Sequence, residues 1–163
     1  MDALQLSEQF LKSLDEIIRA KDGKWSFTEF KTARGLKGRN GFFDACSELF
    51  VPFAGLPKPV IYEAIREVLR KRGSDHVVQR YVGMALLNLI PDAYGQVDEL
   101  IDIIAPVFDV SNGEIPAFLV EQVGMEPLTK KIEHRKQAAG SEATIRLDGI
   151  IYQAKIYLKR KAQ

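Results

Sequence analysis

Four basic residues and three glycines gather in one short stretch, KTARGLKGRNGFF, at positions 31–43. It carries Lys31, Arg34, Lys37 and Arg39 without an acidic residue, and its glycines recur at every third position. Lysine and arginine bind phosphate groups, and the backbone N–H groups at the start of a following helix favour anions. The stretch is therefore a candidate contact for a phosphate or a nucleic-acid backbone.

The glycine pattern of this stretch does not match a nucleotide-binding loop. A Walker loop requires GxxxxGK followed by Ser or Thr after a strand, and the stretch lacks that sequence. Residues 35–38 read GLKG, a GxxG of the kind with which KH domains clamp nucleic acid, but the sequence predicts none of the strands of a KH domain. We favour a solvated, glycine-broken connection between two helices. An anion or nucleic-acid contact is the alternative.

Residues for acid–base or nucleophilic catalysis are few. The two histidines, His76 and His134, fall in no catalytic pattern, and the sequence has no GxSxG motif. Cys46 lies in DACSELF on the apolar face of a predicted helix, where a thiol is normally an inert core group. HExxH, CxxC and calcium-loop patterns are absent. We therefore expect a non-enzymatic protein without a metal or cofactor.

Charged residues are unevenly distributed along the chain, although the formal net charge is only +1. Residues 1–80 hold 14 Lys and Arg against 11 acids, residues 81–129 hold 8 acids and no Lys or Arg, and residues 130–163 hold 9 basic residues against 3 acids. The favoured interpretation is that the acidic and basic segments face each other in the fold. The alternative is that they form separate binding patches.

The acidic patch and the basic patch would bind partners of opposite charge. The acidic candidates, which could meet a basic protein, are Asp98, Asp102 and Asp109. The basic candidates are KKIEHRK at 130–136 and the tail residues Lys155, Lys159, Arg160 and Lys161. These could meet an acidic partner or nucleic acid, although tail lysines also favour a helix C-terminus electrostatically.

The sequence predicts that helices position these charged residues. Apolar residues recur at three- and four-residue steps, and no segment alternates apolar and polar residues as a strand does. Ser26 with Glu29 forms a capping box, Pro59 fits a first helical turn, Ser74 or Asp75 fits an N-cap, and Ser141 fits another. The pattern predicts an all-α fold of about eight or nine helices. Their approximate ranges are 4–22, a short helix from 27, 42–53, 59–73, 75–90, 97–108 with Pro106 in its last turn, 116–124, 126–137 and 141 onward.

The sequences of three of these predicted helices can be aligned with one another. When the sequence is shifted by about 37 residues, Ile115, Phe118, Leu119 and Val123 align with the apolar positions of residues 75–90. A shift of 36 residues in the opposite direction aligns the apolar residues of 42–53 with the same positions. Such spacing is typical of stacked helical pairs, in which each unit buries its apolar face against a neighbour.

The second-helix pattern of HEAT repeats occurs at Asp75, Val78, Ala85, Leu86 and Leu89, and Pro106 resembles the proline of many HEAT first helices. The chain is thus similar to HEAT-type repeat proteins over about residues 59–90, and more loosely to residue 124. It departs from the pattern at Gln79, where a basic residue is usual. The resemblance implies stacked antiparallel helix pairs that act as a binding scaffold. An irregular helical bundle is the alternative.

Composition is that of one globular domain over residues 1–163, with 46% apolar and 28% charged residues. A single cysteine fits a reducing, cytoplasmic location, and neither a secretory signal nor an apolar run long enough for a membrane span is expected. The leading hypothesis is a non-enzymatic protein-interaction module whose partner is another protein or an identical chain. The alternative is a nucleic-acid-binding protein that uses Lys31–Arg39 and the basic C-terminal helix.

Overall fold

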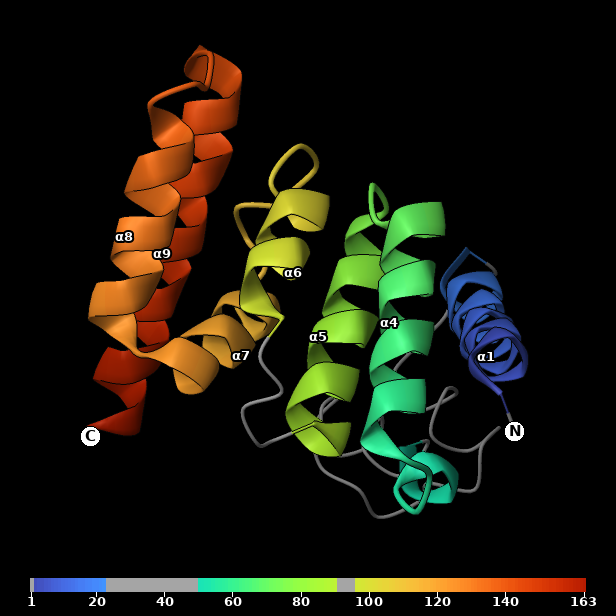
Figure 1. Ribbon diagram of the computed structural model, residues 1–163. Coiled ribbons are helices and arrows are strands. Elements are labelled where there is room, and N and C mark those ends of the chain that lie inside the picture. The colour runs from blue at the N-terminus through green and yellow to red at the C-terminus, as the bar shows by residue number, and fades with distance from the viewer. Residues whose placement is uncertain (1, 23–49, 91–95) are drawn as a thin grey trace.

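Helices account for nearly all of the regular structure in a computed structural model, which describes residues 2–22, 50–90 and 96–163 (Figure 1). These ranges contain seven α-helices and one short 3-10 helix, and no strand. The predicted all-α class is confirmed, with slightly fewer helices than the eight or nine expected. The Lys31–Arg39 stretch, Cys46, the predicted helix from residue 27 and most of the one at 42–53 lie outside the described residues.

The structure describes eight helical elements. In chain order they are α1 (Ala3–Asp22), η1 (Val51–Phe53), α4 (Lys58–Arg72), α5 (His76–Leu89), α6 (Val97–Ile104), α7 (Glu114–Val123), α8 (Met125–Lys136) and α9 (Ser141–Lys161).

Local sequence signals set several helix ends. Pro59 lies in the first turn of α4. Backbone N–H groups in a first turn have no acceptor within the helix, so the N–H that proline lacks is not needed there. Asp75 caps α5, because its Oδ1 accepts a hydrogen bond from the backbone N of Val77 at 2.8 Å. Gly124 has a φ of 85°, a left-handed conformation that glycine adopts without strain, and it separates α7 from α8. These short-range signals explain why the predicted boundaries are close to those observed.

Two predicted boundaries were wrong. The helix expected over residues 97–108 ends at Ile104, so that Pro106 lies beyond α6 and does not bend its last turn. Pro106 has no N–H to donate to the carbonyl of Asp102, and its ring would crowd that carbonyl. Ser141 is the first residue of α9 and not its cap; the N-cap is Gly140, whose carbonyl accepts from Thr144 N at 2.9 Å.

The helices pack as a series of neighbours. α1 packs on α4, α4 on α5, α5 on α7 and α7 on α9, while α8 runs beside α9 and α6 touches both α4 and α7. Figure 1 shows α1, α4 and α5 side by side at one end and the α8–α9 pair at the other, with α7 crossing between them. The acidic helices α6 and α7 therefore lie in the middle of the molecule.

One continuous cluster of buried apolar side chains extends from α1 to α9. At the α1 end it contains four aromatic rings, with the centroids of Phe10 and Phe53 4.9 Å apart and those of Phe50 and Tyr81 5.2 Å apart. At the other end Leu147, Ile150 and Ala154 of α9 are buried, as the helical pattern predicts. This core fixes α5, α7 and α9 relative to one another.

The alignment of residues 75–90 with residues 115–123 concerns two helices that pack directly on each other, α5 and α7. Membership of a HEAT-like family stays a prediction. Within the described ranges, the helices are too short or too polar to cross a lipid bilayer.

Candidate functional site

The acidic helix α6 and the basic helix α8 face each other through ion pairs. Lys131 Nζ lies 2.7 Å from Asp98 Oδ2, and Arg135 reaches both Asp98 Oδ1 at 3.1 Å and Asp102 Oδ1 at 2.7 Å. The Arg135 side chain is mostly buried, whereas the two carboxylates remain largely exposed. The acidic and basic segments thus meet within the fold at this point.

These contacts shift the titration of Asp98. The hydrogen bond from Lys131 is the main reason that the pKa of Asp98 lies below its ordinary value, and the neighbouring Arg135 acts in the same direction. Asp98 is therefore held as a carboxylate by cations of the same chain.

Asp109, the third predicted acidic residue, belongs to a different surface. It lies in the connection between α6 and α7, and its Oδ1 accepts hydrogen bonds from Ser111 N at 3.0 Å and Ser111 Oγ at 2.7 Å. The structure thus brings Asp98 and Asp102 together and places Asp109 apart from them.

The predicted basic tail is also divided. Lys161 pairs with Glu121 of α7, which also accepts a hydrogen bond from Tyr157 Oη at 2.6 Å. The bond from Lys161 is the main cause that lowers the pKa of Glu121. Arg160 lines a groove, whereas Lys155 and Lys159 are exposed.

The groove lies where α5, the α6–α7 connection, α7 and α9 meet. It consists of two cavities of about 410 and 550 Å³, which share Gly113, Glu114, Gln153, Ile156 and Arg160 in their walls. We call the two together the α9 groove. Its remaining wall residues are His76, Arg80, Leu87, Asp109, Ser111, Asn112, Ala117, Tyr152 and Tyr157.

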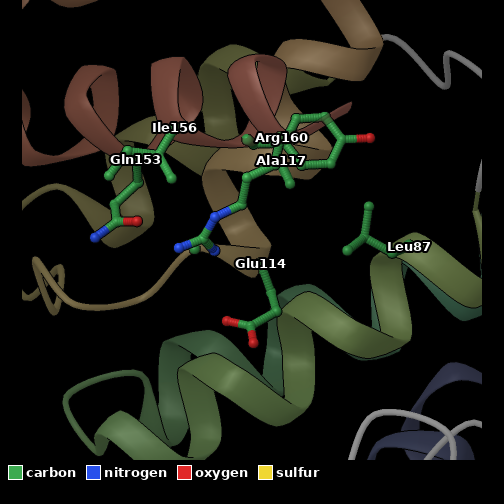
Figure 2. A pocket seen from close by; sticks show the side chains of 8 residues that line it. Leu87, Glu114, Ala117, Gln153, Ile156 and Arg160 are labelled. Atoms are coloured by element: carbon green, nitrogen blue, oxygen red, sulfur yellow. The ribbon is translucent and has the colours of Figure 1, made fainter. Parts of the chain in front are cut away.

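Apolar and polar groups occupy different parts of this groove. Leu87, Ala117 and Ile156 supply an apolar surface, while Figure 2 shows Glu114 and Arg160 reaching into the same space from α7 and α9. A concave site with an apolar wall and a few convergent polar groups is the usual form of a binding site.

An exposed apolar row continues from the groove along α9. Ile145 and Tyr152 are seven residues apart on one side of the helix and have exposed fractions of 64% and 62%. Val110 extends this row from the α6–α7 connection, because its side chain packs on Gly149 so closely that an added Cβ would lie 2.8 Å from Val110 Cγ1. Gln153 Nε2 also donates to Val110 O at 2.7 Å, which ties the connection to α9.

Sequence reasoning identified only Arg160 and Asp109 among the groove residues. The rest come from segments that are far apart along the chain, so no local motif joins them. The sequence did contain one indication of this site. Ile145, Tyr152 and Ile156 form a second apolar row on α9, separate from the row that faces the core. Within the described residues, no cluster of His, Cys, Asp or Glu has the arrangement of a metal site.

Comparisons of the chain with protein-family models, with curated proteins and with solved structures gave no match. The α9 groove and its surroundings are therefore the features of the molecule that bear on its function.

Proposed function

We propose that this protein is a non-enzymatic protein-interaction module that holds a segment of a partner protein in the α9 groove. The observation that supports the proposal is the combination of the groove with the exposed row Val110, Ile145 and Tyr152 beside it. Apolar side chains that gather around a concave surface are typical of protein-binding sites, and tyrosine is enriched in them.

The surrounding structure suits a site that binds without rearranging. Gln153 of α9 holds the α6–α7 connection through Val110 O, and Asn112 Oδ1 accepts from Ile115 N at 3.0 Å at the start of α7. The walls of the groove are thereby fixed before a partner arrives. A preformed site loses less conformational entropy on binding.

The partner is proposed to be another protein. A second copy of the same chain could also occupy the groove, which would make the protein a homo-oligomer. We include a cytoplasmic location, for which the single cysteine is the support. Nucleic-acid binding remains the alternative, and it depends on the Lys31–Arg39 stretch. The C-terminal helix supports it less, because Lys161 is engaged by Glu121.

Site-specific photo-crosslinking tests the proposal. Benzoylphenylalanine is placed at Tyr152, beside the groove, and in a matched variant at Lys130, which is exposed on α8 and away from the groove. Both proteins are expressed in their native cells, irradiated, and treated with nuclease before electrophoresis and mass spectrometry.

We expect a discrete protein adduct from the Tyr152 position that is absent from the Lys130 position. Loss of that adduct in the additional variant Ile156→Glu would assign it to the groove. Equal labelling from both positions, or an adduct that nuclease removes, would contradict the proposed function.

A further inference from the structure

We infer that the α9 groove binds an acidic segment with apolar side chains. This inference rests on the proposed function and adds the chemistry of the partner. It follows from the difference between three cationic groups of α9, which form no ion pair within the described residues, and the nearby carboxylates, most of which are paired with cations of the protein.

The cationic groups lie on both sides of the apolar row. Arg160 lines both cavities of the groove, and Lys155 and Lys159 are exposed on the same helix. None of these three forms an ion pair with another residue in the part of the chain that the structure describes. Arg80 lines the opposite wall, on α5, where it is paired with Glu114. A ligand in the groove therefore meets the positive charge of α9.

The carboxylates near the groove have partners of their own. Glu114 lies 3.5 Å from Arg80 Nε and accepts from Asn112 Nδ2 at 3.2 Å. Asp109 is bound by Ser111, and Asp148 on α9 lies 2.7 Å from Lys136 of α8. Glu114 and Asp148 are thus paired with cations of the chain, and Asp109, whose donors are neutral, stands against three cations of α9 that form no ion pair within the described residues.

The groove also lies at the N-terminal ends of two helices. His76 is the first residue of α5 and Glu114 the first residue of α7, and both are in its wall. The partial positive charge of these helix N-termini adds to the charge of Arg160. Charge complementarity thus favours a partner segment rich in Asp or Glu, whose apolar side chains would cover Val110, Tyr152 and Ile156.

Three fluorescein-labelled helical peptides provide the test. They share one apolar face of Leu, Ile and Phe and differ only in carrying Glu, Gln or Lys at all other positions. Binding to the full chain is measured by fluorescence anisotropy at low and at moderate salt. We expect the Glu peptide to bind at least about tenfold more tightly than the Lys peptide, with an advantage that decreases as salt increases.

Charge reversal then locates the interaction. The double substitution Lys159→Glu and Arg160→Glu should weaken binding of the Glu peptide about five- to tenfold and strengthen binding of the Lys peptide. The matched control Lys130→Glu adds the same kind of charge on α8 and should change neither. Circular dichroism and urea unfolding confirm that both variants are folded.

The outcomes separate this inference from the proposed function. Equal binding of the Glu, Gln and Lys peptides, no binding of the Glu peptide, or an unchanged affinity in the double variant would overturn the acidic preference. A protein adduct at position 152 would then leave the proposed function standing, with a partner of different chemistry. Without such an adduct the proposed function itself fails.

Discussion

The backbone N of Asp109 donates a hydrogen bond of 2.9 Å to Oε1 of Gln79, a side chain with no exposed surface. Nε2 of the same amide donates to Gly73 O at 2.8 Å and to Val107 O at 2.6 Å. One glutamine on α5 therefore satisfies three backbone groups and fixes the connection that leads from α6 into the groove. It stands at the position where the HEAT pattern has a basic residue.

Replacement of Gln79 should destabilise the protein strongly. Gln79→Ala would leave Gly73 O, Val107 O and Asp109 N without their partner, and each unpaired group in a buried setting costs roughly 1–3 kcal/mol. Allowing for water that enters the space, we expect a loss of about 2–4 kcal/mol in the free energy of unfolding, measured with urea.

The control for this substitution is Asn88→Ala on the same helix. Asn88 is exposed and its Nδ2 donates to Met84 O, one turn earlier on the same helix, so its removal should cost less than about 0.5 kcal/mol. A cost for Gln79→Ala no greater than that for Asn88→Ala would show that the amide does not hold the connection.

The ion pairs between α6 and α8 should make stability depend on pH. The pKa of Asp98 is lowered in the folded protein, so its contribution is present above its unfolded value near 3.8 and is lost as the pH falls through the folded value. Because this carboxylate is largely exposed, Arg135→Ala should cost only about 0.5–1 kcal/mol near pH 7.

That cost should become smaller as the pH falls below the ordinary value near 3.8 and through the lowered pKa of Asp98. Part of it should persist, since Arg135 also donates to the backbone O of Lys131 at 3.0 Å. Urea unfolding at pH 7 and pH 3 measures both values, with Lys130→Ala, whose partner Glu126 is also highly exposed, as the control. An identical cost for Arg135→Ala at the two pH values would contradict the ion-pair account.

The parts of the fold that could be predicted are those set by short-range chemistry. The cap at Asp75, the proline in the first turn of α4 and the apolar spacing of α9 each act within a few residues, so the sequence displays them directly. The end of α6 was predicted too late, because the apolar pattern continues to Phe108. The helical backbone hydrogen bonds stop earlier, because Pro106 has no N–H to donate.

The candidate site could not be predicted in the same way. Asp98 and Lys131 are 33 positions apart, and Gln153 meets Val110 across 43 positions, so these contacts depend on how α6, α7 and α9 pack. Charge segregation along the chain indicated that acidic and basic segments could meet, and they do so at α6 and α8. It did not indicate that Arg160, unlike Lys161, would remain available beside a groove.

The nucleic-acid alternative makes a distinct prediction for the Lys31–Arg39 stretch, which lies outside the described residues. If it is a solvated connection, DNA and RNA should show no detectable binding at low salt, and the double substitution Lys37→Ala and Arg39→Ala should change stability by less than about 0.5 kcal/mol. We expect this outcome because no aromatic residues are interleaved with the basic ones. Micromolar, salt-sensitive binding that the double substitution abolishes would reverse the ranking of the two functions.

α5 and α7 approach each other closely at Gly83, opposite the groove residue Glu114. A Cβ at position 83 would lie 2.5 Å from Glu114 Cβ and 3.0 Å from Ile115 N, so a larger residue must push the start of α7 away. Alanine would gain about 1 kcal/mol in helix propensity, but crowding in a packed interior costs roughly 1–3 kcal/mol.

We therefore expect Gly83→Ala to lower the free energy of unfolding by about 1–2 kcal/mol, measured with urea, and to weaken binding of the Glu peptide because Glu114 and Asn112 move with α7. Gly140→Ala is the matched control. No atom approaches within 4 Å of a Cβ at Gly140 and its φ of −74° suits alanine. Because Gly140 is the N-cap of α9 and alanine is a poorer N-cap than glycine, the free energy of unfolding should fall by no more than about 0.5 kcal/mol. If Gly83→Ala proves as stable as the wild type and binds the Glu peptide equally well, the contact between α5 and α7 does not set the shape of the groove. The apolar row on α9 would then have to support the binding site without the opposite wall.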